Sequence, residues 1–367
     1  MNILHIHRRF FPNIGGVEKY IYNLSGKLIE KKINTRVLTL NYDIFNKDKK
    51  DKDFDIIKGI EIYRIPGFGH YKKPIPLRIP IDCFGWADIV HIHDPRILFE
   101  TSIILKKIYG YKLVFSTHGF IFHTDNFLRI KLFMARRYYR PIITKYFDGI
   151  ICDSKQDYDY FSKWKLDNTI LFENPINFKK FNSIGKNINT ENLLYFGRVD
   201  WNKGLDMLFG SLSLLKNKKW HLDIAGPGSK DVIIKLKKLA ESLNISNKIK
   251  WHGFIDDGKL FSMINKAHIC LFPSTYEGFG FTLVEAMAAG CICIANSIKP
   301  YEDIIRNNYN GYIVDFTQTD KAAKVIAKLL SKPVDRMVSL ENNAVNRARD
   351  YDWSERIDEI IRLYKSV

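Results

Sequence analysis

The feature that most constrains this chain is a regular alternation of short apolar runs with longer segments of helical periodicity. The runs predict strands at residues 3–6, 35–40, 60–65, 89–92, 113–116 and 149–152, and again at 193–196, 221–225, 248–252, 269–272, 291–295 and 311–314. Strands that are apolar on both faces and separated by helices are typical of parallel sheets covered on both sides. Two such series predict an α/β protein with two Rossmann-like domains.

The domain boundary is expected in the polar, Asn- and Lys-rich stretch at residues 177–192. It divides the chain into an N-terminal domain over 1–180 and a C-terminal domain over 181–350. The charged segment 43–55 is expected to be a loop, and an amphipathic helix is predicted at 353–364. Ligands of such folds lie beyond the carboxyl ends of the strands, so the chemistry is expected in the residues that follow each strand.

The composition excludes several classes of protein. No run approaches the ~18 apolar residues of a membrane span, and residues 1–6 lack the basic-then-apolar order of a signal peptide, so a cytoplasmic location is expected. The cysteines show no CxxC spacing, which indicates buried, reduced thiols. They are Cys83, Cys152, Cys270, Cys291 and Cys293.

The positive charge is uneven, with a net +12 in residues 1–180 and +5 in the rest. An anionic membrane, a phosphorylated substrate or a solvated Lys-rich surface each account for it. No nucleic-acid-binding motif is present, so no nucleic-acid partner is expected. A basic, aromatic helix is predicted at 127–145, interrupted by Pro141, with one stripe formed by Arg129, Arg136 and Arg140 beside Phe133, Tyr138 and Tyr139. It suits anionic lipid or a pyrophosphate-lipid acceptor, and an ordinary surface helix is the alternative.

The segment from Glu277 to Glu285 follows a predicted strand and contains Gly278 and Gly280. Glycines allow a ligand to approach the backbone, and a helix capped by Thr282 would present amides to a phosphate. Two simpler interpretations are a capping box that uses Glu285 and an exposed loop acid at Glu277. A glycosidase pair is excluded, because eight helical residues span about 12 Å whereas hydrolytic carboxylates lie roughly 5–9.5 Å apart.

Other residues that follow strands are candidates for ligand contacts. Arg198 and Lys203 could converge on a diphosphate, or form an ordinary basic loop. Residues 226–228 (Gly-Pro-Gly) are interpreted as a plain turn, and Gly16 belongs to a Gly-Gly turn before a helix. His118 is expected at a ligand-facing strand end.

The pair His91 and His93 has the spacing of metal ligands. The two side chains would face the same side of a strand, but the sequence offers no third ligand beside them. No metal site is therefore expected.

Together these motifs resemble the retaining GT-B glycosyltransferases with an E-x7-E motif, glycosyltransferase family four. The resemblance spans nearly the whole chain and rests on residues 14–18, 117–119, 174–175, 197–198, 203–204, 273–274 and 277–285. At 174–176 the chain has Asn-Pro-Ile where the family usually has Asn-Gly-Val. The resemblance implies two Rossmann-like domains that face each other across a cleft, with a C-terminal helix over 351–367 packed on the first domain.

Carried over by position, the resemblance implies a nucleotide-sugar site. Arg198 and Lys203 would hold the diphosphate, and Glu285 would bind the ribose. The donor sugar and distal phosphate would meet Glu277, Gly278 and the amides of Phe279, Gly280 and Phe281. The base would lie at Gly253 and Phe254, Gly16 would approach the diphosphate from the other domain, and His118 would contact the sugar near the reacting carbon. No metal or other cofactor is implied.

Within the family, residues 116–124 and 194–198 look most like the α-mannosyltransferases of bacterial exopolysaccharide assembly. This similarity implies transfer of mannose from GDP-mannose to a glycan or a polyprenyl-diphosphate-linked saccharide. The enzyme would be peripheral on the inner face of the cell membrane. Three alternatives stay open: a UDP-sugar-dependent transferase of the same family, a nucleotide-sugar epimerase, and a silent nucleotide-sugar-binding subunit.

Overall fold

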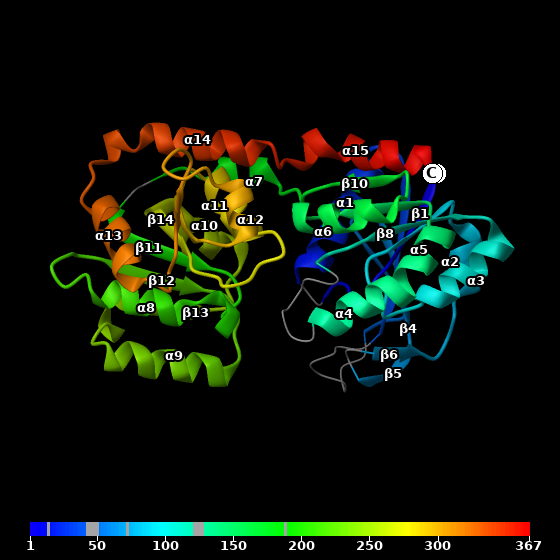
Figure 1. Cartoon of the computed structure of the whole chain (residues 1–367), viewed down its shortest axis with the longest axis horizontal. Coiled ribbons are helices and arrows are strands. Elements are labelled where there is room, and N and C mark those ends of the chain that lie inside the picture. Colours follow the sequence, from blue (N-terminus) through cyan, green and yellow to red (C-terminus); the bar gives the residue numbers. More distant parts are fainter. Residues whose placement is uncertain (13–14, 42–50, 71–72, 120–127, 187–188) are drawn as a thin grey trace. The chain divides into compact units, whose positions relative to one another are not determined.

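The computed structural model describes residues 1–12, 15–41, 51–70, 73–119, 128–186 and 189–367 (Figure 1). These residues form two compact units. The N-terminal unit comprises Met1–Pro175 and Ser354–Val367, and the C-terminal unit comprises Ile176–Trp353. The chain thus divides at 175/176, where the sequence placed the boundary at 180/181. No described helix is long and apolar enough to cross a bilayer.

The N-terminal unit is built on an eight-stranded sheet with the order β10-β9-β8-β7-β1-β2-β4-β3. Its strands are β1 (Asn2–Ile6), β2 (Asn34–Leu40), β3 (Phe54–Ile57), β4 (Ile60–Ile65), β7 (Ile89–Ile92), β8 (Lys112–Ser116), β9 (Gly149–Cys152) and β10 (Thr169–Leu171). Only β3 and β4 pair in antiparallel fashion among these described strands. Every residue of β7 and β9 is buried, as expected for strands covered on both faces.

The helices of this unit connect or flank those strands. They are α1 (Gly16–Glu30), α2 (Ile81–Trp86), α3 (Phe99–Tyr109), α4 (Leu128–Met134), α5 (Arg140–Tyr146), α6 (Lys155–Phe161) and α15 (Trp353–Ser366), with a 3-10 turn, η2, at Ser162–Trp164. A small hairpin of β5 (Gly67–His70) and β6 (Lys73–Pro76) stands apart from the main sheet.

The C-terminal unit has a six-stranded, fully parallel sheet with the order β13-β12-β11-β14-β15-β16. The strands are β11 (Asn189–Phe196), β12 (His221–Ala225), β13 (Ile249–Gly253), β14 (Ala267–Phe272), β15 (Ile292–Asn296) and β16 (Tyr312–Val314). Successive residues of β11 enter opposite cores, since Leu193 packs in one cluster and Leu194 in the other. This double burial explains why the last four residues of the strand, 193–196, are all apolar.

Eight helices and three 3-10 turns of this unit fall within the described residues. The helices are α7 (Phe178–Asn182), α8 (Leu205–Ser213), α9 (Lys230–Ser242), α10 (Asp257–Lys266), α11 (Phe281–Ala288), α12 (Lys299–Ile304), α13 (Thr319–Leu330) and α14 (Val338–Arg349). The 3-10 turns are η3 (Trp201–Lys203), η4 (Ser246–Lys248) and η5 (Val334–Arg336).

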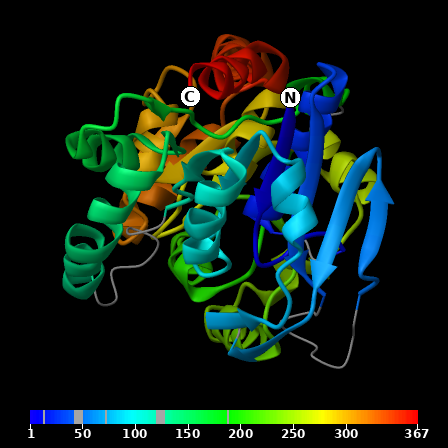
Figure 2. The same cartoon turned by 90° about the vertical axis from the view of Figure 1, so that its right-hand side faces the viewer.

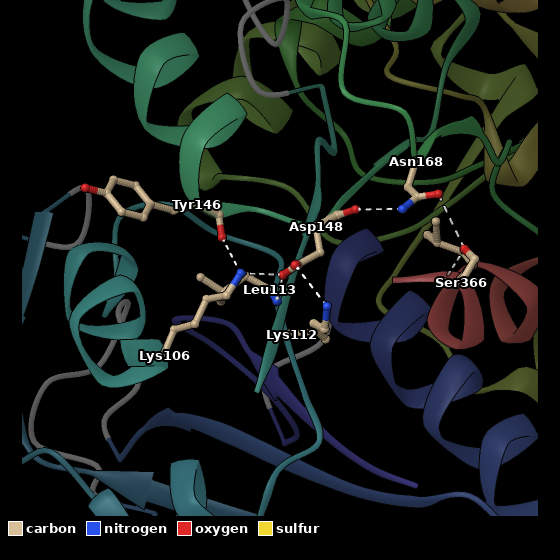
Figure 3. A network of polar contacts seen from close by, with 8 residues as sticks. Lys106, Lys112, Leu113, Tyr146, Asp148, Asn168 and Ser366 are labelled. Carbon is tan, nitrogen blue, oxygen red and sulfur yellow. Dashed lines mark hydrogen bonds and ion pairs between the residues drawn. The ribbon is translucent and has the colours of Figure 1, made fainter. Parts of the chain in front are cut away.

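The last helix, α15, belongs to the N-terminal unit from Ser354 onward, and both chain ends lie in that unit (Figures 1 and 2). Arg356 donates to the carbonyl of Glu173 at 2.8 Å. Near the end of the helix, Ser366 lies 3.5 Å from Asn168, which donates to the carbonyl of Asp148 at 3.1 Å (Figure 3).

The Asp148 side chain extends this network to the strand β8. One carboxylate oxygen accepts from Lys106 at 2.6 Å and from the amide of Leu113 at 2.7 Å (Figure 3). Lys106 also donates to the carbonyl of Tyr146 at 2.7 Å. The Asp148 side chain therefore joins α3, β8 and the end of α5. The backbone carbonyl of Asp148 is bonded to Asn168, which contacts α15.

The observed secondary structure differs from the expected one in two details. β3 begins at Phe54, inside the segment 43–55 that was expected to be a loop, and residues 43–50 of that segment lie outside the described residues. The helix expected over 127–145 is α4 and α5 joined by a π-helical turn, η1, at Ala135–Tyr139. The π-helical turn ends two residues before Pro141, whose ring nitrogen cannot pair with the carbonyl four residues earlier.

Candidate functional site

The loops that follow β11 and β14 lie side by side in the C-terminal unit. The sheet order reverses between these strands, because β12 and β13 lie on one side of β11 while β14 to β16 lie on the other. In open α/β sheets, ligands bind beyond the carboxyl ends of the strands at such a reversal. The two loops are joined there by the amide of Thr275, which donates to the carbonyl of Asn202 at 2.9 Å.

Glu277 accepts three hydrogen bonds at one carboxylate oxygen, Oε1. The donors are Lys203 Nζ at 2.6 Å, Ser274 Oγ at 2.9 Å and Tyr301 OH at 3.1 Å. The side chains of Lys203 and Glu277 are only 13% and 18% exposed, so solvent screens this ion pair weakly. Within the described part of the chain, no side chain or amide donates to Oε2, which leaves that oxygen for a ligand.

Burial and the nearby charge of Glu277 raise the pKa of Tyr301 well above its ordinary value. The phenol therefore stays protonated and continues to donate to the carboxylate. Tyr195 lies in the same region, and its pKa is raised mainly by burial and then by the charge of Glu277. Sequence reasoning missed Ser274 and Tyr301 as partners of Glu277, although Ser274 stands just after a predicted strand.

Two glycines in these loops are required by close approach. Gly204 has φ +65°, and a Cβ there would lie 2.2 Å from the carbonyl oxygen of Pro273. Gly280 has φ +114°, and its Cβ would lie 2.8 Å from the ring of Tyr301. Both positions combine left-handed backbone with contact that excludes a side chain. The glycines thus allow the Lys203 loop and the Glu277 loop to meet.

The sequence 226–228 is more than the plain turn that was expected. Gly226 has φ +143°, and a Cβ there would lie 1.8 Å from the carbonyl oxygen of Gly197. The loop after β12 therefore packs backbone to backbone against the start of the Arg198 loop.

The helix α11 begins at Phe281, with Gly280 as its cap residue and no side-chain capping bond. Thr282 is the second helical residue, so the capping box that was considered for Thr282 and Glu285 does not form. The first amides of a helix have no partner within it and favour an anion. Glu285 is buried at 5% exposure, and its predicted contact with ribose stays a prediction.

Phe279 and Gly278, which also belong to the segment from Glu277 to Glu285, differ in exposure. Phe279 is buried against Tyr351, with ring centroids 5.4 Å apart, so only its backbone is suited to a ligand. Gly278 is half-buried, and a Cβ there would have no atom within 4 Å. The segment therefore offers backbone at 278–281 and one carboxylate at Glu277.

Arg198 follows β11 and is 62% exposed, with Asp200 at 3.9 Å as its ionic neighbour. Its carbonyl accepts from Tyr195 OH at 2.6 Å, which fixes the backbone while the guanidinium extends into solvent. Asp200 also caps η3, because its side chain accepts from the amide of Trp201 at 2.8 Å. The structure thus places Arg198 and Lys203 in one loop, but only Lys203 touches Glu277.

The predicted base-binding residues are Gly253, the last residue of β13, and Phe254, which follows it. Gly253 has φ +65°, and its carbonyl accepts from the amide of Gly226 at 2.7 Å. Phe254 is 76% exposed, an unusual exposure for a ring of this size. An exposed aromatic face suits stacking on a nucleotide base.

In the N-terminal unit, Gly16 is the exposed first residue of α1. At the preceding Gly15, a Cβ would lie 2.3 Å from Oε2 of Glu18. Glu18 is buried and pairs with Arg9 at 2.8 Å and His7 at 3.5 Å. Burial acts to raise the pKa of Glu18, but His7 and Arg9 outweigh it and the pKa is lowered.

A second buried acid, Asp94, was missed by sequence reasoning. It pairs with Arg8 at 3.0 Å and with Arg96 at 2.6 Å, just after β7. Burial acts to raise its pKa, yet the charges of His7 and the two arginines hold the pKa below its ordinary value. The strand order of this sheet also reverses at β1 and β7, so these charges lie at its ligand-binding edge.

His118 follows β8 and has φ +43°, a conformation uncommon for a residue with a side chain. Its Nδ1 lies 3.5 Å from Asp153 and its Nε2 lies 3.0 Å from His93. Its neighbours are tied to Asp157, which lies 2.6 Å from Thr117 Oγ1 and accepts from the Gly119 amide at 3.1 Å. Both ring nitrogens of His118 therefore have protein partners.

The pair His91 and His93 does have a third histidine beside it, contrary to expectation. His5 is paired with His91 in the β1–β7 register, and one ring nitrogen from each of His5, His91 and His93 lies within 4.8 Å of the others. His91 hydrogen-bonds Tyr364 at 2.7 Å and Ser116 at 2.8 Å. Periodicity within one strand could not reveal His5, because it lies on a different strand.

The α4–η1–α5 segment exposes both apolar and basic side chains. Ile130, Phe133 and Met134 are 59%, 60% and 41% exposed. Four exposed arginines accompany them, Arg129, Arg136, Arg137 and Arg140. Tyr138 and Tyr139 were expected on this face, but Tyr138 hydrogen-bonds Glu100 and Tyr139 packs on Phe99.

Comparison with known families gives two matches that together span most of the chain. Residues 14–179 match the model described as Glycosyltransferase Family 4, and residues 177–350 match Glycosyl transferases group 1. The junction of the two matches falls near the division between the structural units.

Two curated relatives are similar over the full length of this chain. A protein of Komagataeibacter xylinus named GDP-mannose:cellobiosyl-diphosphopolyprenol alpha-mannosyltransferase is 28% identical, with 100% of this chain and 93% of the relative covered. A protein of the same name from Xanthomonas campestris is 26% identical, with 100% and 97% covered.

Solved structures share the fold. Sucrose-phosphate synthase from Thermosynechococcus elongatus aligns with a TM-score of 0.78 at 18% identity, covering 100% of this chain and 98% of that one. HepE of Anabaena, in complex with UDP-glucose, aligns with a TM-score of 0.78 at 16% identity, covering 100% of both chains. The architecture is the GT-B fold, as the sequence predicted.

Proposed function

Because this chain belongs to the family 4 glycosyltransferases with a group 1 C-terminal domain, we propose that it transfers mannose from GDP-mannose to a polyprenyl-diphosphate-linked saccharide. The chain is a glycosyltransferase with the GT-B fold. Both curated relatives named above carry this donor and acceptor in their names. We further propose that transfer retains the anomeric configuration and serves surface-polysaccharide assembly.

The observation that carries the proposal is the pairing of Lys203 with Glu277 at the reversal between β11 and β14. In the proposal, Lys203 and the exposed Arg198 neutralise the charge that develops on the departing nucleoside diphosphate. Oε2 of Glu277, which no described residue engages, accepts from a sugar hydroxyl. The amides at the start of α11 bind the distal phosphate.

Further contacts complete the donor site in this proposal. Glu285 binds the ribose, and Gly253 and Phe254 hold the base. Gly16 approaches the diphosphate, and His118 lies near the reacting carbon. None of these roles uses a metal ion, because Lys203, Arg198 and the helix amides supply the positive potential.

The acceptor lipid suggests where the enzyme works. We propose that the exposed face of α4, η1 and α5 docks on the anionic inner surface of the cell membrane. Ile130, Phe133 and Met134 would enter the interface, while the four arginines bind lipid phosphates. Binding there would bring the N-terminal unit close to a lipid-linked saccharide.

A transfer assay tests the proposed reaction. Purified protein is incubated with radiolabelled GDP-mannose and a polyprenyl-diphosphate-linked disaccharide, and the labelled lipid and released GDP are both measured. Parallel reactions use UDP-glucose and ADP-glucose. Equal appearance of mannosyl-lipid and GDP supports the proposal, whereas transfer from a UDP-sugar alone would replace GDP-mannose as the donor. Interconversion of free nucleotide sugars would indicate an epimerase, and absence of release with every donor would indicate a silent binding subunit.

A further inference from the structure

Four histidine rings lie in and beside adjacent strands of the N-terminal sheet. His5 belongs to β1, His91 lies in β7 and His93 just after it, and His118 follows β8, in the sheet order β1-β7-β8. The ring centroids of His93 and His118 lie 5.3 Å apart and the ring planes are 22° apart, as expected for two rings joined end to end by a hydrogen bond. His5 and His118 come from segments distant from the His91/His93 pair, and the sheet brings all four together.

Two hydrogen bonds join three of these rings in a row, and the last ring faces a carboxylate. Asp153 lies 3.5 Å from His118 Nδ1, His118 Nε2 lies 3.0 Å from His93 Nδ1, and His93 Nε2 lies 3.0 Å from His5 Nδ1. The far end, Nε2 of His5, is buried and has no hydrogen-bond partner among the described residues.

The ionised state of Asp153 follows from its surroundings. Burial acts to raise its pKa, but His118, Asn174 and the neighbouring Asp157 outweigh it and hold the pKa below its ordinary value. The proton that the two acids can share stays on Asp157, whose pKa is raised by burial and by the charge of Asp153. Asp153 is therefore a carboxylate, which accepts hydrogen bonds and donates none.

The carboxylate fixes the proton positions along the whole chain. His118 must carry its proton on Nδ1 to donate to Asp153, so its Nε2 can only accept. His93 then donates from Nδ1 and accepts at Nε2, and His5 donates from Nδ1. Burial lowers the pKa values of His5 and His93, so these rings are neutral and have no second proton.

The opposite set of tautomers is disfavoured at both ends. It would place a proton on Nε2 of His5, where a buried donor would have no acceptor. It would also leave a lone pair of His118 facing the Asp153 carboxylate. Both effects select the same tautomer of His118.

We propose that His93 is a positioning residue for sugar transfer, holding the ring of His118 in one tautomer and one orientation between itself and Asp153. This inference rests on the proposed function, which places His118 beside the reacting sugar. Nδ1 of His118 faces Asp153 and Nε2 is bonded to His93. Neither ring nitrogen is therefore available to exchange a proton with the acceptor hydroxyl. Its ring instead forms a fixed wall of the sugar site.

The same rings could be imagined as a metal site, because His5, His91 and His93 cluster within 4.8 Å. Metal coordination would break the hydrogen bond between His5 and His93 and a hydrogen bond of His91 to Tyr364 or Ser116. The hydrogen-bonded chain is therefore favoured, and bound metal becomes an outcome of the test.

The test compares two substitutions of His93 in the full-length protein. In His93→Asn the amide nitrogen falls near the position of Nδ1 and can still donate to His118. His93→Leu keeps similar bulk and removes the donor. The control is His221→Leu, at an exposed position of β12 in the other unit.

The kinetic readout separates positioning from binding. We expect His93→Leu to lower kcat by about 10- to 100-fold, as for a small misplacement near a reacting centre. KM for GDP-mannose should change by less than about threefold, since the proposal assigns His93 no direct contact with the donor. His93→Asn should restore most of the activity, and His221→Leu should match the wild type. Equal loss in both His93 variants, or none in either, would overturn the proposal.

A second readout needs no substrate and therefore stands apart from the proposed function. Long-range ¹H–¹⁵N NMR of histidine-labelled protein reports which ring nitrogen carries the proton, with resonances assigned from single substitutions. At neutral pH we expect the ring proton on Nδ1 of His5, His93 and His118. His118 should keep this tautomer in His93→Asn and should show a mixture of both tautomers in His93→Leu. A proton on Nε2 of His118 in the wild type would overturn the proposed role of His93, even if mannose transfer is established. Tautomers that change when Zn²⁺ binds in equimolar amount would do the same. If the expected tautomers are found but no donor is turned over, the proposed function is wrong and the hydrogen-bonded row of histidines is confirmed.

Discussion

In the C-terminal unit, the ammonium nitrogen of Lys203 lies 2.6 Å from Oε1 of Glu277. The two side chains come from loops 74 residues apart and meet because β11 and β14 are neighbours in the sheet. A nucleoside diphosphate would compete for the three N–H donors of Lys203. We expect the pair to orient both side chains before the donor binds.

The first prediction concerns the diphosphate role of the basic loop. Lys203→Ala and Arg198→Ala should each lower kcat by about 10²–10³, a loss of roughly 2.7–4 kcal/mol of transition-state stabilisation. The matched control is Lys180→Ala, which removes a lysine paired with Asp257 at 2.7 Å on the surface. Steady-state kinetics with the radiolabelled donor gives the values. Near-wild-type turnover in both loop variants would rule out the diphosphate role.

The second prediction uses two glycines of one loop. Gly280→Ala should lower the free energy of unfolding by about 1–3 kcal/mol, because it forces a left-handed residue against the ring of Tyr301. Gly278→Ala is the matched control, since its Cβ would meet no atom within 4 Å. Urea denaturation of the three proteins gives the comparison. Equal stability of the two variants would show that Tyr301 does not restrict the turn.

Much of the fold could be predicted from the sequence, because each strand is a short apolar run between helical segments. The runs at 60–65, 89–92, 149–152 and 221–225 match β4, β7, β9 and β12 residue for residue. β5 and β6 were missed because glycine, proline and polar residues leave them without an apolar pattern. β10 was missed because its three residues are too few to show a period.

The candidate site was predictable where a motif lies in one segment and not where the sheet joins separate segments. The loops at 198–204 and 277–285 were found as motifs, but the contact of Lys203 with Glu277 depends on strand order. The same holds for Tyr301, which reaches Glu277 from α12, and for His5, which lies beside His91. The capping box failed because Gly280 is the cap residue and the helix begins at Phe281, two residues before a helix capped by Thr282 would begin.

The third prediction concerns the network of Asp148. Asp148→Ala should lower the free energy of unfolding by about 1–3 kcal/mol, since it leaves Lys106 and the amide of Leu113 without their shared acceptor. Asp167→Ala, at an exposed position, is the control. Urea denaturation checks both variants. A loss in Asp148→Ala no larger than in the control would show that water replaces the carboxylate.

The fourth prediction is a loss of stability in mild acid caused by buried histidines. Burial lowers the pKa of His5 to about 3 and lowers those of His91 and His93 well below 6.5. Below pH 6.5 the unfolded chain binds protons that the folded protein does not, so stability is present above that pH and falls as pH decreases. Each histidine contributes up to about 1.4 kcal/mol per pH unit.

Urea denaturation between pH 7 and pH 5 measures this slope. The substitution His5→Asn removes one of the three groups and should make the slope shallower. An unchanged slope would mean that His5 is protonated in the folded protein.

The fifth prediction tests the membrane face. The triple substitution of Arg136, Arg137 and Arg140 to Glu should weaken binding to anionic vesicles by at least about 10²-fold, since each basic residue at such a surface contributes about 1 kcal/mol. The control reverses Lys235, Lys237 and Lys238, three exposed residues of α9. Vesicle sedimentation at low and high salt gives both affinities. Equal weakening by the two triple variants would mean that net charge, rather than this face, governs binding.

The central claim is that a nucleoside diphosphate is held where Lys203 meets Glu277. The most direct test is thermal unfolding of wild type, Lys203→Ala and Lys180→Ala with GDP, UDP or ADP. A ligand at 100 times its Kd stabilises the folded state by about 2.7 kcal/mol. We predict that GDP raises the Tm of wild type and Lys180→Ala and that the rise is largely lost in Lys203→Ala. An equal rise in all three proteins, or no rise with any nucleotide, would contradict the claim.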